Sequence, residues 1–105
     1  MTATAEIFRA LGDPIRLEMV QRLRRGSRCT ISVISEGLGI TRQGARKHLQ
    51  VLADANLVAL HPEGRDVLVS LEPDALDQAK QFITELERRW DTRLDALRKF
   101  VEESS

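Results

Sequence analysis

Cysteine is almost absent from this chain, which has Cys29 alone among its 105 residues. A single cysteine cannot form a disulfide within the chain, as is usual for proteins of the reducing cytosol. The sequence also lacks an apolar run near the roughly 20 residues of a membrane span. Its first residues lack the basic and apolar segments of a signal peptide. We therefore expect a cytoplasmic protein without a membrane partner.

Aromatic residues are scarce, at 4% of the chain. Proteins that hold single-stranded nucleic acid stack the bases on exposed aromatic side chains, so this composition argues against that class. The chain also shows no nucleophile, base and orienting acid at a recognisable spacing, and no glycine-rich phosphate loop after a strand. These absences predict that the protein is not an enzyme.

Metal ligands are few. Zinc and soft metals require three or four nitrogen or sulfur ligands, whereas the chain offers Cys29, His48 and His61 at no usable spacing. We therefore expect no metal site and no cofactor. An ordinary, at least half-buried cysteine is the simpler interpretation of Cys29, and the alternative is a redox thiol without a resolving partner in the same chain.

The chain has no net charge, with 16 basic and 16 acidic residues, but the two signs are unevenly distributed. Residues 1–71 hold ten Lys and Arg against seven Asp and Glu, whereas residues 72–105 hold six against nine. The basic residues of the first part form two clusters, Arg22, Arg24, Arg25 and Arg28, and Arg42, Arg46 and Lys47. Because the potential near a polyanion depends on such clusters, the neutral sum does not exclude nucleic acid as a partner.

Helix signals fill the first half of the sequence. Residues 5–11 predict a short helix that Gly12 ends. Asp13 and Pro14 then cap and start a second helix, which is expected to end at Gly26. Its apolar stripe comprises Ile15, Met19, Val20 and Leu23.

Two further helices are predicted around a glycine-bearing turn. Ser32 is the expected cap of the third helix, with Ile31 before it as a hydrophobic staple. Gly39 suits a left-handed turn residue. Thr41 caps a fourth helix that runs to about Ala55. Its expected apolar positions are Ala45, Leu49, Val51 and Leu52.

After the fourth helix the spacing of hydrophobic residues along the sequence changes. Residues 57–60 and 67–71 are short and rich in apolar and β-branched residues, which predicts a β-hairpin whose exposed tip is 62–65. Residues 73–103 predict one long helix with an apolar stripe along one face. Roughly 30 helical residues span about 45 Å, whereas a compact domain of this length has a radius of gyration of only about 13 Å.

The long helix therefore projects beyond the core of its own chain, and a second copy of the chain is the simplest cover for its apolar face. We expect a homodimer formed through the first and last helices. The predicted interface consists of apolar side chains from both, namely Ile7, Phe8, Leu11, Leu76, Ile83, Leu86, Trp90, Leu94 and Leu97.

Two short helices joined by a tight turn and followed by a hairpin have the order of a winged helix-turn-helix. Residues 8–17 (FRALGDPIRL) resemble the opening motif of ArsR-type bacterial repressors, and residues 38–58 resemble their recognition helix and following strand. Residues 90–97 (WDTRLDAL) resemble a branch of that family with a tryptophan in the last helix. The metal sites of the family are not matched, since position 31 is Ile and the last helix has no His.

The resemblance covers nearly the whole chain and implies a fold and a function. The fold is a mainly α winged helix-turn-helix of five helices and a β-hairpin wing, in one domain over residues 1–105. The function is that of a homodimeric repressor that binds double-stranded DNA at an inverted-repeat operator.

The residue types of the fourth helix suit that role. Its expected solvated face carries Arg and Gln, which can contact guanine and adenine bidentately, while Lys, His and the helix start suit phosphates. Arg65 at the hairpin tip could enter the minor groove or contact a phosphate. The candidate DNA-binding residues are Thr41, Arg42, Gln43, Arg46, Lys47, His48, Gln50 and Arg65.

Several of these interpretations have alternatives. The basic helix could be plain solvated surface, in which case the protein would be a dimerisation or protein-interaction module without specific DNA binding. An effector of unknown identity could lie between the last helix and the core, and Trp90 could line its pocket. A structural role is favoured for Arg16 over a phosphate contact, and the cluster at residues 22–28 is expected to be mostly solvated.

Overall fold

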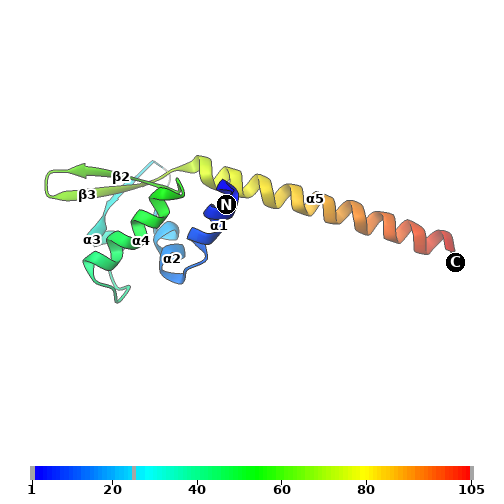
Figure 1. The fold of residues 1–105 in the computed structure, drawn as a ribbon, viewed down its shortest axis with the longest axis horizontal. Coiled ribbons are helices and arrows are strands. Elements are labelled where there is room, and N and C mark those ends of the chain that lie inside the picture. Colours follow the sequence, from blue (N-terminus) through cyan, green and yellow to red (C-terminus); the bar gives the residue numbers. More distant parts are fainter. Residues whose placement is uncertain (1, 25, 105) are drawn as a thin grey trace.

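The computed structural model describes residues 2–24 and 26–104, which form five helices and three strands (Figure 1). In chain order these are α1 (Ala3–Leu11), α2 (Pro14–Arg22), β1 (Arg28–Thr30), α3 (Ile31–Ile34), α4 (Arg42–Asp54), β2 (Val58–Glu63), β3 (Asp66–Leu71) and α5 (Pro73–Ser104). The fold predicted from the sequence, a mainly α winged helix-turn-helix with five helices and a β-hairpin wing, is confirmed.

The sheet has one strand more than the sequence predicts. It is antiparallel with the order β1-β3-β2, and Cys29 of β1 lies opposite Val69 of β3. In the hairpin, Glu63 of β2 faces Asp66 of β3 across the tip. Because β1 is only three residues long, it carries too little alternation to be recognised in the sequence.

Two helix ends differ from the predicted positions. The second helix, α2, ends at Arg22 instead of Gly26, because Leu23 adopts an extended conformation and is buried. Thr30, and not Ser32, caps α3, since its Oγ1 accepts a hydrogen bond from the amide of Val33 at 3.3 Å. Gly39 has the predicted left-handed conformation, with φ of 68°.

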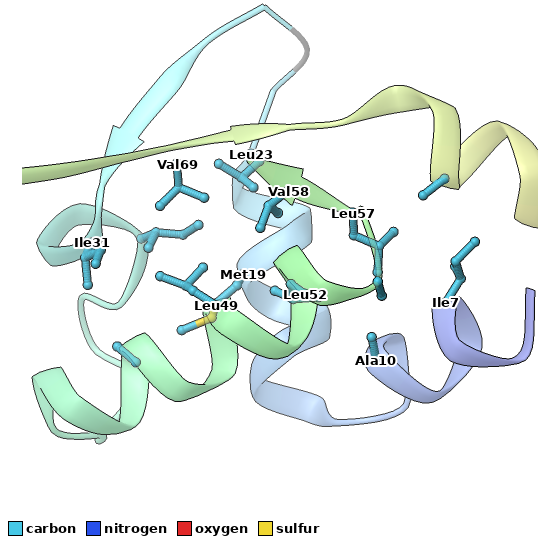
Figure 2. Packing of buried hydrophobic residues seen from close by; sticks show 14 of the residues in the cluster. Ile7, Ala10, Met19, Leu23, Ile31, Leu49, Leu52, Leu57, Val58 and Val69 are labelled. Atoms are coloured by element: carbon cyan, nitrogen blue, oxygen red, sulfur yellow. The ribbon is translucent and has the colours of Figure 1, made fainter. Parts of the chain in front are cut away.

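The core lies between helices α1 to α4, the sheet and the first turns of α5, with α3 and α4 packed on the strands. Figure 2 shows its buried side chains. Met19, Leu49 and Leu52 are fully buried there. Two predictions about apolar residues are wrong. Ile7 is 2% exposed, so it belongs to the core and not to an interface, and Val51, predicted to be buried, is 40% exposed.

The last helix dominates the shape of the molecule. Figure 1 shows α5 leaving the rest of the fold after its first turns and extending alone to the C-terminal end. The radius of gyration is 19.0 Å and the extents are 70 × 25 × 25 Å, whereas a compact domain of this length has a radius near 13 Å. Within the described ranges no helix combines the length and the apolar character needed to cross a membrane.

Candidate nucleic-acid interface

The first turn of α4 is set by its cap. Thr41 precedes the helix in an extended conformation, and its Oγ1 accepts a hydrogen bond from the amide of Gly44 at 2.9 Å. A Cβ atom at Gly44 would lie 3.2 Å from that hydroxyl oxygen. Glycine at this position therefore leaves room for the cap.

The buried side of α4 fixes which side faces outward. Ala45, Leu49 and Leu52 are 0% exposed and anchor the helix on the core. The residues predicted to face solvent are all exposed, namely Arg42, Gln43, Arg46, Lys47 and Gln50. We refer to these five side chains as the α4 outer face.

The charges of the α4 outer face are available to an anionic ligand. In the part of the chain that the structure describes, no acidic group forms an ion pair with Arg42, Arg46 or Lys47. Gln50 donates a hydrogen bond from its amide nitrogen to Asp54 Oδ1 at 2.8 Å, which fixes the amide of Gln50 on the same helix. The arrangement combines three free cations with two amides on one helix.

His48 lies apart from the α4 outer face. Its side chain is 23% exposed, and Arg16 Nη1 in α2 donates a hydrogen bond to its Nδ1 at 3.3 Å. Arg16 also donates from Nε to the carbonyl of Ala10 at 2.7 Å. Arg16 thus has the structural role that the sequence favours, although its partners are a carbonyl and an imidazole. The sequence predicts a phosphate contact for His48, and the inward position of its side chain does not support that contact.

Asp13 completes this junction of helices. Its Oδ1 accepts hydrogen bonds from the amides of Ile15 at 2.8 Å and Arg16 at 3.1 Å, which caps α2. The hydrogen bond from the Arg16 amide holds the pKa of the Asp13 carboxyl below its ordinary value, because this bond, the Ile15 amide and the nearby charges together outweigh the opposing effect of burial. The ionised carboxylate is therefore the state that holds the start of α2.

Arg22 holds the turn between α3 and α4, a role that the sequence does not reveal. Its Nη1 donates to the carbonyls of Ile34 at 3.1 Å and Glu36 at 2.6 Å, and its Nε pairs with Glu18 at 3.2 Å. The expectation of a mostly solvated cluster is therefore wrong for Arg22, while Arg24 and Arg28 are exposed. Arg25, the fourth member of the cluster, lies outside the described residues.

The hairpin of β2 and β3 forms the wing. Gly64 adopts φ of 61° at its tip, and Arg65 beside it is exposed, as predicted. Figure 1 shows the wing and the start of α4 at the same end of the molecule, opposite the C-terminal end of α5. Arg65 and the α4 outer face therefore belong to the same end of the fold.

The opposite part of the molecule carries an apolar surface. Along α5 the large apolar side chains are 44% to 70% exposed, and they comprise Phe82, Ile83, Leu86, Trp90, Leu94, Leu97, Phe100 and Val101. Phe8 of α1 is 36% exposed, whereas Leu11 and Leu76 are partly buried against the core. We call Phe8 together with the eight α5 side chains the α1–α5 apolar face.

Metal ligands do not converge anywhere in residues 2–24 and 26–104, where no three side chains of His, Cys, Asp and Glu are placed to hold an ion. Cys29 is a half-buried, free thiol in β1.

Known proteins resemble this chain in sequence. A family model described as a helix-turn-helix domain matches residues 11–61. A probable mercury resistance operon repressor from Streptomyces lividans is 35% identical over 68 residues, which cover 65% of this chain and 54% of that protein. An uncharacterised HTH-type transcriptional regulator from Methanocaldococcus jannaschii is 32% identical over 83 residues, which cover 78% of this chain and 92% of that protein. The chain thus spans about half the length of the first relative and nearly all of the second.

A solved structure resembles the whole fold. It is an ArsR-like transcriptional regulator from Rhodococcus sp. RHA1, with a TM-score of 0.78 and 26% sequence identity. The likeness covers 93% of this chain and 92% of that one, so it includes most of the long last helix.

Proposed function

The chain belongs to the ArsR-type family of winged helix-turn-helix transcriptional regulators, and on that premise we propose that it is a repressor that binds a specific double-stranded DNA sequence as a homodimer. The observation that carries this proposal is the α4 outer face, where Arg42, Arg46 and Lys47 are exposed without an ion-pair partner in the described chain. A helix of this kind fits the major groove of B-form DNA.

Each residue type has a distinct task in that complex. Arg42 and Arg46 read guanine through bidentate hydrogen bonds, and Gln43 and Gln50 read adenine. Thr41 and Lys47 hold phosphates and thereby fix the register of the helix on the duplex. Arg65 reaches a phosphate or the minor groove from the wing.

The α1–α5 apolar face supports the homodimer. Trp90 and Leu97 are 55% and 60% exposed, and a contiguous apolar surface of this kind marks an interaction site. A two-fold dimer presents two copies of α4, which predicts an inverted repeat with half-sites about one helical turn, or a multiple, apart. Occupation of such an operator would block access of the polymerase.

A gel-shift experiment tests the proposal. The full chain is mixed with genomic fragments that include the region upstream of its own gene, with unrelated duplex as competitor. We expect one fragment to be retained at a competitor excess that releases the others. Equal release of all fragments would favour the alternative, a dimerisation module without specific DNA binding.

A further inference from the structure

The guanidinium of Arg16 joins three helices at one point. Its Nε donates to the carbonyl of Ala10 in the last turn of α1, and its Nη1 donates to Nδ1 of His48 in the middle of α4. Its own backbone amide is held by the Asp13 cap at the start of α2. Arg16 therefore ties α4 to the α1–α2 pair, and α1 carries Phe8 of the α1–α5 apolar face.

The chemistry of this contact requires a neutral histidine. A guanidinium only donates hydrogen bonds, so Nδ1 of His48 must accept with its lone pair while Nε2 carries the proton. When the imidazole is protonated, Nδ1 becomes a donor and the contact with Arg16 turns into repulsion between like charges. The nearest acceptor is then Asp13 Oδ1, which lies 4.0 Å from Nδ1.

Four elements pack against α4, namely α1, α2, α3 and β2. Arg16 and Asp13, from α2 and its cap, face the imidazole directly. The α1 helix contributes Glu6 and Arg9, which line a surface groove with Arg16 and with Asp54 of α4. The short helix α3 has no titratable residue. The strand β2 carries Glu63 and His61, and the Nε2 of His61 forms a hydrogen bond with Ser70 Oγ at 2.9 Å. The contacts of His48 with both Arg16 and Asp13 depend on the charge of the imidazole, and only the contact with Arg16 is within hydrogen-bond distance.

We propose that Arg16 and His48 are positioning residues for DNA binding: neutral His48 holds α4 in its reading orientation through Arg16, and protonation of His48 breaks this contact and shifts α4 on the core. This inference rests on the proposed function. Histidine is the side chain that ordinarily changes charge between about pH 5 and pH 8. Loss of the contact with Arg16 on protonation of His48 therefore lowers the operator affinity of the protein.

The sign of the pH effect separates this role from a phosphate contact. A protonated imidazole beside a phosphate would strengthen binding at low pH, whereas loss of the contact with Arg16 weakens it. Operator affinity is measured by fluorescence anisotropy of the full chain at about pH 8 and about pH 5.5. We expect the affinity to be roughly fivefold lower at the lower pH, a factor within the range of coupling between residues in contact. An increase in affinity would overturn the proposal.

Two matched variants assign the effect to one residue. In His48→Gln the amide oxygen can accept from Arg16 at any pH, so this variant should keep its affinity at the lower pH. His61→Gln removes the other histidine of the sequence and should retain the wild-type pH dependence. Pronounced pH dependence in His48→Gln, or its loss in His61→Gln, would overturn the proposal.

The contact can also be observed without DNA. Nitrogen-15 NMR of the free protein at about pH 8 should show His48 as the tautomer protonated on Nε2. Protonation on Nδ1 would overturn the proposal, whatever the DNA result. A wild-type chain that binds no duplex at either pH would instead refute the proposed function, so the two failures are distinguishable.

Discussion

The ring of Phe8 in α1 meets the ring of Phe82 in α5 edge to face, with centroids 5.6 Å apart and planes at 61°. This geometry is a preferred one for aromatic pairs. The contact joins the first helix to the last, and both rings remain partly exposed, at 36% and 49%. The pair therefore marks the start of an apolar surface that continues along α5.

A charge placed within that surface should separate the subunits. In Leu94→Asp, a residue that is 57% exposed in the single chain would bring an unpaired carboxylate into the interface. We expect a monomer by light scattering at concentrations at which the wild-type chain is a dimer. Thr92→Asp is the matched control, because two residues along a helix point about 160° apart. A dimer that persists in Leu94→Asp would contradict the interface.

Loss of an arginine on the α4 outer face should weaken specific binding. Removal of the base contact in Arg42→Ala or Arg46→Ala should cost about 1–3 kcal/mol of operator binding and relax the sequence preference at one position. Competition titrations with operator variants measure both effects. Lys80→Ala removes a positive charge from exposed α5 surface and should leave the affinity nearly unchanged. Unchanged operator affinity in both arginine variants would remove α4 from the reading surface.

The wing arginine should affect the salt dependence of binding. If Arg65 neutralises one phosphate in each subunit, Arg65→Ala reduces the magnitude of the slope of log K against log salt by about 1 per subunit. Sequence preference should remain, because a phosphate contact carries no base information. Titrations at several salt concentrations test this, and an unchanged slope would mean that the wing does not contact a phosphate.

Arg22 should contribute to the stability of the helix-turn-helix. Arg22→Ala leaves the carbonyls of Ile34 and Glu36 without their donor, which should lower the free energy of unfolding by about 2 kcal/mol. Urea denaturation measures this change. Arg24→Ala, in the same basic cluster but exposed, should cost much less. Equal losses of unfolding free energy in the two variants would mean that the hydrogen bonds of Arg22 to these carbonyls do not stabilise the turn.

The main helices and the wing follow from local sequence signals. Asp13, Thr41 and Gly39 act through hydrogen bonds or dihedral angles of the adjacent backbone, which is why their roles are recognisable in the sequence. The long apolar stripe of α5 is recognisable for the same reason, because its period is a property of one helix.

The roles that sequence reasoning missed depend on residues far apart in the chain. Arg22 looks like an ordinary surface arginine until folding brings a carbonyl 12 residues away within reach. The structural role of Arg16 is predicted, but its partner is a histidine 32 residues away that the sequence does not point to. Val51 lies at the edge of the apolar side of α4, so periodicity alone could not decide its exposure. An apolar stripe does not show whether its cover comes from the same chain or from a partner, so the stripe alone predicts an interface position for Ile7, which lies in the core.

Selection of bound sequences from a random pool of duplex DNA tests the central claim most directly. The α4 outer face, presented twice by a homodimer, predicts an enriched inverted repeat whose half-sites lie about 10–10.5 base pairs, or a multiple, from centre to centre. A pool without enrichment, or one enriched in a single half-site without a symmetric partner, would contradict the account.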